Sequence, residues 1–187
     1  MVKDTNTLNI KAKSSNAESN LLIILTNVLW NPPLDGTESI HSLGRGGSLT
    51  VANGVLRGKA GYVYGFDNVD HWKLSFEAYF TGGSFAVTDS TVTCYDTNYL
   101  QFMASYLRVF TNGTYTDYAY TGNTLIGNEW NIIEVEKINN QYIVSINGDI
   151  VLTNVTWSRN PSQFGVGVDS WGTNINQVKN IFVQKLN

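Results

Sequence analysis

The sequence has 187 residues, of which 42% are apolar and 14% are charged, and its formal net charge is −3. These values exclude a disordered chain, which would have fewer aromatic and more charged residues. The negative charge, without any cluster of Lys and Arg, also argues against nucleic-acid binding. The sequence contains 22 Asn, 18 Thr, 17 Gly and 10 Tyr, residue types that favour strands and tight turns over helices.

The first 30 residues differ in pattern from the rest of the chain. Residues 1–20 contain no apolar stretch typical of a secretory signal peptide. The apolar run LLIILTNVLW at 21–30 is too short to span a bilayer, so it predicts a buried strand near 21–29 and no membrane insertion. Pro32 and Pro33 follow and cannot join a central strand ladder. We therefore predict an N-terminal arm at 1–30 and one domain at 31–187.

Strands are predicted along most of that domain. In HWKLSFEAYF (71–80), Trp72, Leu74 and Phe76 alternate with polar residues, as in a strand with one face on a core. NYLQFMASYLRVF (98–110) repeats the alternation as a hairpin. Further strands are expected near 48–57, 61–66, 84–94, 115–120, 130–137, 140–146, 149–153, 164–168 and 178–186. Gly- and Asn-rich turns separate them at a spacing typical of an all-β sandwich or barrel.

Four segments in this order resemble the concanavalin A-like lectin/glucanase jelly roll, especially its laminin-G-like relatives. They are GSLTVANGVLRGK (47–59), FDNVDHWKLSFEAYF (66–80), EWNIIEVEKINNQYIVSINGDIVLTN (129–154) and FGVGVDSWGTNINQVKNIFVQKL (164–186). The resemblance covers roughly residues 38–187. It implies an antiparallel two-sheet jelly-roll sandwich, preceded here by the short arm. Since this fold serves lectins, glycanases, adhesion modules and virion proteins, function has to be argued from the site.

Catalytic residues are not predicted. Glucanases of this fold carry Glu-x-Asp-x-Glu on one strand, and retaining hydrolysis needs two carboxyl groups about 5–5.5 Å apart. Here only Glu134 and Glu136 come near this pattern, and an acid pair at i and i+2 is common on solvated strands. Neither His41 nor His71 lies near a G-x-S-x-G nucleophile turn. A divergent glycoside hydrolase using Glu134 and Glu136 is kept as an alternative.

Metal ligands are equally sparse. The single cysteine, Cys94, excludes an internal disulfide and a thiolate cluster. The DNVD turn offers oxygen ligands from Asp67, Asn68 and Asp70, which would suit a structural Ca²⁺, as in some relatives of the fold. The alternative is a plain turn. No other cofactor is expected.

Tyrosines on the polar faces of the predicted strands form the candidate binding surface. If the strands are neighbours in one sheet, a shallow groove results, in which aromatic rings stack on sugar C–H faces and polar groups bond hydroxyls. Its residues are Glu77, Tyr79, Tyr99, Gln101, Tyr106 and Arg108. Loop residues Trp157 and Trp171 are added as ligand contacts, although each is also suited to capping the core. The alternative is an ordinary solvated β-face, where Tyr is favoured by strand propensity.

We therefore expect a non-catalytic recognition or adhesion module that binds a glycan. The low charge and abundant Asn, Thr, Gly and Tyr also resemble proteins displayed on phage or virus particles. In that setting the arm would mediate self-association or docking to other virion or surface proteins, and the chain would be located on a virion or cell surface. A purely structural virion protein is the other alternative.

Overall fold

The computed structural model describes residues 7–14, 17–24, 27–42, 48–89, 98–170 and 173–186, which form strands and turns and no helix. The strands are β1 (Thr7–Ser14), β2 (Ala17–Ile24), β3 (Val28–Trp30), β4 (Ile40–Ser42), β5 (Leu49–Ala52), β6 (Val55–Gly58), β7 (Ala60–Asp67), β8 (His71–Tyr79), β9 (Ser84–Asp89), β10 (Tyr99–Phe102), β11 (Tyr106–Thr111), β12 (Thr114–Ala119), β13 (Trp130–Ile138), β14 (Gln141–Ile146), β15 (Asp149–Thr156), β16 (Gln163–Asp169) and β17 (Asn176–Lys185). Within these residues, no helix has the length and apolar character needed to cross a membrane.

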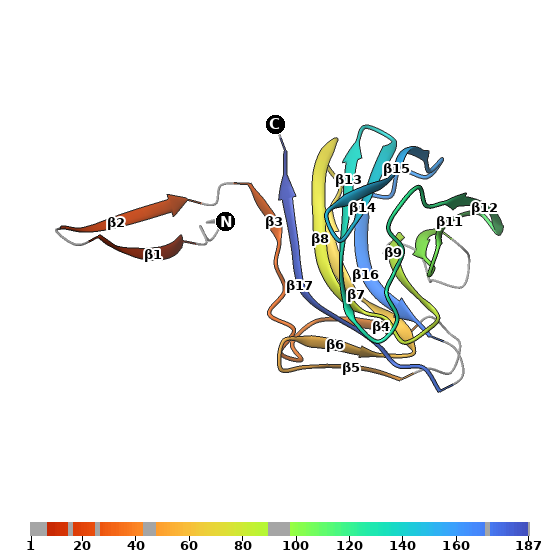
Figure 1. Ribbon diagram of the computed structural model, residues 1–187, viewed down its shortest axis with the longest axis horizontal. Coiled ribbons are helices and arrows are strands. Elements are labelled where there is room, and N and C mark those ends of the chain that lie inside the picture. Colours follow the sequence, from red (N-terminus) through yellow and green to blue (C-terminus); the bar gives the residue numbers. More distant parts are fainter. Residues whose placement is uncertain are drawn as a thin grey trace.

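Two antiparallel sheets pack face to face (Figure 1). The seven-stranded sheet has the order β12-β11-β10-β9-β16-β7-β4. The eight-stranded sheet has the order β15-β14-β13-β8-β17-β6-β5, with β3 added beside β17. This architecture confirms the predicted all-β, antiparallel two-sheet sandwich.

β8 lies near the centre of the eight-stranded sheet, and its residues alternate between the core and the outer face. Trp72, Leu74, Phe76 and Ala78 are at most 1% exposed, while the residues between them are half-buried on the outer face. β8 pairs with β13 on one side and with β17 on the other. The predicted strand at 71–80 is thus confirmed, because a period of two separates a core face from an outer face.

Aromatic side chains from both sheets fill the centre of the core. Trp72 contacts Phe66 and Phe164 with ring centroids 5.0 Å apart in each case. Trp157 packs against Tyr142 and Phe164 at 6.1 Å. Edge-to-face and tilted contacts of this kind add to the gain from burial, so this cluster ties the two sheets together.

Asn-Gly pairs set the register of three hairpins. The φ angles are positive at both residues: 54° and 78° for Asn53-Gly54, 47° and 84° for Asn112-Gly113, and 52° and 89° for Asn147-Gly148. Two left-handed residues in succession match the twist of a two-residue hairpin, and Asn and Gly adopt them most readily. The sequence signal and the geometry agree here.

The N-terminal segment differs from its prediction. The apolar run at 21–29 is not one strand: β2 ends at Ile24, and β3 is a separate short strand that pairs with β17. β1 and β2 pair with each other from Thr7↔Ile24 to Ser14↔Ala17 and form a sheet of their own. Figure 1 shows this hairpin extending away from the sandwich. The run contains two polar residues, Thr26 and Asn27, between the ends of β2 and β3, but one polar pair in a short apolar run has no periodicity that distinguishes two strands from one.

Candidate functional site

The candidate site lies on the outer face of β10, β11 and β12, at one edge of the seven-stranded sheet. In the β10–β11 hairpin Tyr99 lies opposite Phe110, and Gln101 lies opposite Arg108. In the β11–β12 hairpin Arg108 lies opposite Asp117, and Phe110 lies opposite Tyr115. Directly opposed residues share a face. We call this surface the tyrosine–arginine face; its residues are Tyr99, Tyr106, Arg108, Phe110, Tyr115 and Asp117.

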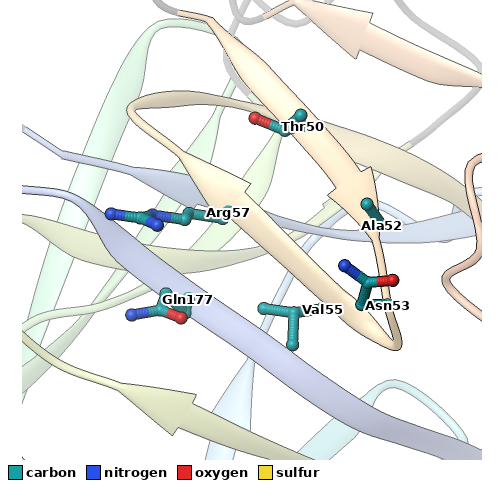
Figure 2. Close-up of a pocket in the computed structure, with 6 residues that line it drawn as sticks. All are labelled: Thr50, Ala52, Asn53, Val55, Arg57 and Gln177. Carbon is teal, nitrogen blue, oxygen red and sulfur yellow. The ribbon is translucent and has the colours of Figure 1, made fainter.

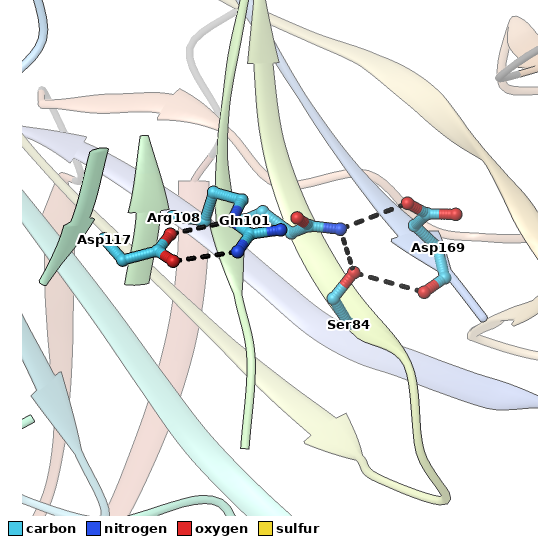
Figure 3. A network of polar contacts seen from close by, with 5 residues as sticks. All are labelled: Ser84, Gln101, Arg108, Asp117 and Asp169. Carbon is cyan, nitrogen blue, oxygen red and sulfur yellow. Dashed lines mark hydrogen bonds and ion pairs between the residues drawn. The ribbon is translucent and has the colours of Figure 1, made fainter. Parts of the chain in front are cut away.

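Arg108 is the centre of this face. Its Nε and one terminal nitrogen donate hydrogen bonds to the two carboxylate oxygens of Asp117, at 2.7 and 2.8 Å (Figure 3). The guanidinium carbon also lies 4.1 Å from the ring centroid of Tyr115 and 5.4 Å from that of Tyr106. A fork of this kind, stacked on aromatic rings, fixes the side chain in one orientation.

The charges of this pair stabilise each other. The hydrogen bonds from Arg108 hold the pKa of Asp117 below its ordinary value. The same bonds raise the pKa of Arg108, against the opposing effect of partial burial. Both side chains therefore remain charged over the physiological range. Since a guanidinium has five N–H donors and Asp117 accepts two bonds, about three N–H groups are left for a ligand.

The aromatic residues of the face range from buried to exposed. Tyr99 is only 6% exposed and stacks on Phe110 with centroids 4.4 Å apart. Phe110 in turn lies 5.5 Å from Tyr115, which is 57% exposed. Tyr99 thus supports the face from below, while Tyr115 offers its ring to the surroundings.

A buried polar network lies next to this face. Gln101 is 3% exposed, and its Nε2 donates to Ser84 Oγ at 2.8 Å and to Asp169 Oδ2 at 3.2 Å (Figure 3). The Ser84 hydroxyl donates in turn to the backbone carbonyl of Asp169 at 3.1 Å. These bonds join β9, β10 and β16. Gln101 therefore holds neighbouring strands together, and its amide is already used within the protein.

The sequence-predicted site residues divide between the two sheets. Tyr99, Gln101, Tyr106 and Arg108 share one face, as predicted. Glu77 and Tyr79 do not join them, because β8 belongs to the other sheet and its outer face points the opposite way. Their expected place in one groove with Tyr99 is wrong. Alternation shows which residues share a face of a strand, but it does not show which strands are neighbours.

Of the two predicted tryptophans, Trp157 lies in the core, which was the alternative to its expected surface role. Trp157 is fully buried, and its Nε1 donates to the carbonyl oxygen of Phe110 at 2.8 Å. It is a core residue that supports the site from inside, because its large apolar ring gains most from burial between the sheets. Trp171 lies outside the described residues.

Both acids of β13 have a partner on the outer face of the eight-stranded sheet: Glu134 forms an ion pair, and Glu136 forms a hydrogen-bonded contact. Glu134 Oε1 lies 2.7 Å from Lys73 Nζ, and Glu136 Oε1 lies 2.8 Å from His71 Nε2. Each carboxylate thus has a partner across the β8–β13 pair. His41, the other histidine, packs against the buried Tyr62 with ring centroids 5.4 Å apart.

The predicted calcium turn is held by protein hydrogen bonds. Asn68 donates to Asn160 Oδ1 at 2.7 Å and accepts from Trp72 Nε1 at 3.3 Å. The buried Lys137 places its ammonium group 3.2 Å from the carbonyl oxygen of Val69. Within the described ranges no three His, Cys, Asp or Glu residues are grouped to hold a metal ion. The calcium site at Asp67, Asn68 and Asp70 stays a prediction.

Several residues of the site were not selected from the sequence. Phe110, Tyr115 and Asp117 are part of the tyrosine–arginine face but not of the predicted groove. The Asn-Gly turn at 112–113 is the signal that would have placed β12 beside β11. Ser84 and Asp169 have no local signal, because their contacts with Gln101 join distant segments.

Comparisons with known proteins agree on the fold. No family model and no curated protein matches the sequence. The carbohydrate-binding module CBM66 from Bacillus subtilis is structurally similar, with a TM-score of 0.60 and 12% identity over 80% of this chain and 98% of that one. The exoplasmic/lumenal domain of VIP36, in its metal-free form, gives a TM-score of 0.59 and 11% identity over 86% of this chain and 92% of that one.

A third similar structure is domain 4 of AbnA, a GH43 extracellular arabinanase from Geobacillus stearothermophilus, in complex with arabinotriose. Its TM-score is 0.55, with 11% identity over 85% of this chain and 92% of that one. Together with the two-sheet topology, these similarities confirm the predicted concanavalin A-like jelly-roll fold.

Proposed function

We propose that this chain is a non-catalytic carbohydrate-recognition module that binds a glycan on its tyrosine–arginine face. The observation that carries the proposal is the position of Arg108, which is fixed by Asp117 and Tyr115 while about three of its N–H groups remain free. The prearranged fork costs little ordering on binding, which favours affinity. Similar structures of this fold include a protein named as a carbohydrate-binding module and a domain solved with arabinotriose, and this supports the proposal.

The chemistry of the face suits a sugar. The exposed ring of Tyr115 can stack on the apolar C–H face of a pyranose or furanose. The free N–H groups of Arg108 and the carboxylate of Asp117, which is 39% exposed, can bond neighbouring hydroxyls. A hollow of about 220 Å³, lined mainly by threonines, lies on the opposite side of β11 and β12, where the buried Val109 pairs with Thr116, so it is not part of the tyrosine–arginine face.

The non-catalytic part of the proposal is supported by the state of the acidic residues. Glu134 is ion-paired to Lys73, Glu136 lies within hydrogen-bond distance of His71, and Asp117 is held ionised by Arg108. A retaining hydrolase needs one carboxylic acid that is protonated at the start of the reaction. In the described part of the chain, no carboxyl group on the tyrosine–arginine face has such an environment.

We further propose that the N-terminal hairpin attaches the module to a larger surface, such as a virion or a cell envelope. Among the described residues, β1 and β2 form ladder pairs only with each other. Their outer edges are therefore open to another chain, and open strand edges readily add a further strand. Pull-down of the full chain and of a variant lacking residues 1–26 with candidate surface proteins tests this arm. Equal retention of both chains would contradict it.

Glycan recognition is tested with a glycan array followed by calorimetry on the best ligand. Tyr115→Ala should weaken binding about tenfold, which is the loss typical of an aromatic residue at the centre of a binding site. Ile150→Ala is the matched control, because Ile150 is 59% exposed but lies on β15 of the other sheet. Unchanged affinity in both Tyr115→Ala and Arg108→Gln would show that the site is elsewhere. The absence of any ligand would favour a structural role, and turnover of an oligosaccharide that Glu134→Gln abolishes would favour a hydrolase.

A further inference from the structure

Five side chains form a continuous row across the strands on the outer face of the eight-stranded sheet. Thr50 lies opposite Arg57, Arg57 opposite Gln177, Gln177 opposite Tyr79, and Tyr79 opposite Trp130. One residue comes from each of the neighbouring strands β5, β6, β17, β8 and β13. With neighbouring strands about 4.8 Å apart, the row is about 19 Å long. We call it the cross-strand row.

One end of the row is a hollow. It has a volume of about 340 Å³ and is lined by Thr50, Ala52, Asn53, Val55, Arg57 and Gln177 (Figure 2). Figure 2 shows the side chains of Arg57 and Gln177 side by side over this part of the sheet. No carboxylate lines the hollow. An anion entering it would meet hydrogen-bond donors and no like charge.

Arg57 differs from the other cations on this face. Lys73 lies 2.7 Å from Glu134, and Lys179 lies 3.1 Å from Glu77. Arg57 is exposed and has no ion-pair partner in the part of the chain that the structure describes. Arg57 is thus a positive charge left unpaired by the described residues, on a protein whose net charge is −3.

The opposite end of the row is aromatic. The rings of Tyr79 and Trp130 lie 5.5 Å apart, and Trp130 is 38% exposed. Lys179 Nζ lies 4.0 Å from the centroid of Trp130 and is also paired with Glu77, whose pKa is lowered mainly by a hydrogen bond from Asn180 and further by Lys179. Glu77 and Lys179 thus neutralise each other beside the aromatic pair. The row has a cationic end and an aromatic end, with the amide of Gln177 between them.

We propose that the cross-strand row is a second binding site that takes an oligosaccharide of hexuronic acids, independent of the tyrosine–arginine face on the other side of the sandwich. The planar guanidinium of Arg57 receives a uronate carboxylate through two parallel hydrogen bonds. Gln177, Thr50 and Asn53 bond sugar hydroxyls, and a further ring of the chain stacks on Trp130. A ligand spanning both ends lies across the strands, along the row.

The test is an NMR titration of the ¹⁵N-labelled full chain with trigalacturonate, and with the same trisaccharide after reduction of its carboxyl groups. The expected result is a set of amide shifts at Arg57, Gln177 and Tyr79 with trigalacturonate and at least tenfold weaker binding of the reduced sugar. Equal binding of the two probes, or shifts confined to β10–β12, would overturn the proposal. If trigalacturonate does not bind, the titration is repeated with triguluronate and with triglucuronate. Failure of all three uronates to bind would also overturn the proposal.

Variants separate the role of Arg57 from a general loss of charge. Arg57→Gln should weaken trigalacturonate binding at least tenfold, and Arg57→Lys should give an intermediate affinity, because lysine keeps the charge but lacks the fork. Lys185→Gln is the control, since it removes one exposed positive charge from β17 away from the row. An equal effect of Arg57→Gln and Lys185→Gln would show only a long-range charge effect and would refute the site. Tyr115→Ala changes the tyrosine–arginine face and leaves the cross-strand row intact. Binding at the two sites is therefore tested separately, and one proposal can fail while the other holds.

Discussion

The indole N–H of Trp157, inside the sandwich, donates a 2.8 Å hydrogen bond to the backbone carbonyl of Phe110, on the strand that carries Arg108. Trp157 is fully buried between Tyr142 and Phe164. The core thus fixes the position of β11 from below through one directional bond. The aromatic packing and the geometry of the tyrosine–arginine face are coupled at this point.

Replacing Trp157 by Phe should therefore affect both stability and the site. The variant removes the donor for the Phe110 carbonyl and leaves a void, and we expect a loss of about 2–4 kcal/mol in the free energy of unfolding. Urea unfolding followed by fluorescence and circular dichroism measures it. Amide shifts should concentrate in β11 and β12. A loss below about 0.5 kcal/mol would mean that the hydrogen bond contributes nothing net.

The Arg108–Asp117 pair makes a prediction about pH. Asp117 has a lowered pKa in the folded state, so the pair stabilises the fold above the ordinary carboxyl pKa, and this contribution is lost as the pH falls through the lowered value. For an exposed pair the effect is below about 1 kcal/mol. A ¹³C NMR titration of the Asp117 carboxyl group should show a higher pKa in Arg108→Gln than in the wild type. An identical pKa in both proteins would contradict the assignment of Arg108 as its cause.

Local patterns allow the hairpins to be predicted, including part of the site. The β10–β11 hairpin joins adjacent segments, so alternation alone brought Gln101 and Arg108 to one face. The pairing of β8 with β17 joins segments about a hundred residues apart, and no local pattern gives it. Alternation therefore places Tyr79 on the outer face of its strand but does not show that its neighbour is Gln177 and not Tyr99.

The sequence also could not show that the outer faces of β9 and β10, in the seven-stranded sheet, are buried. All residues of β9 and β10 are buried, on both faces, so Tyr99 and Gln101 are inaccessible although they alternate with core residues. Polar and apolar residues alternate in a strand whose polar face is exposed to solvent. They alternate in the same way when the polar face is covered by other parts of the protein, so the sequence pattern does not distinguish the two cases. The contact of Gln101 with Asp169, 68 positions away, exists only in the folded chain.

That contact leads to a second pH prediction. Gln101→Glu would place a buried carboxyl group beside the Asp169 carboxylate, where burial and the like charge both raise the pKa of the new group. A raised folded-state pKa stabilises only at low pH, so the variant should lose about 3–5 kcal/mol at pH 7 and recover part of this below pH ~4. Urea midpoints at the two pH values measure the recovery. Gln101→Met, which has no titrating group, is the control and should lose similar stability at both.

β7 and β16 approach each other closely at Gly167, so we predict that replacing this glycine by alanine destabilises the fold. A Cβ at Gly167 would lie 2.3 Å from the carbonyl oxygen of Gly61 and 2.6 Å from Tyr62 Cβ, so Gly167→Ala forces two strands apart. We expect a loss of about 3 kcal/mol or more in the free energy of unfolding, since neither contact is with the far end of a flexible side chain. Gly127→Ala is the matched control: a Cβ there meets nothing within 4 Å, and the change should stay within about 0.5 kcal/mol. Thermal and urea unfolding of both variants decide the matter. Tyr62 is buried on the outer face of the sheet, apart from the main core. Equal stability of the two variants would therefore mean that Tyr62 and β7 can shift at little energetic cost.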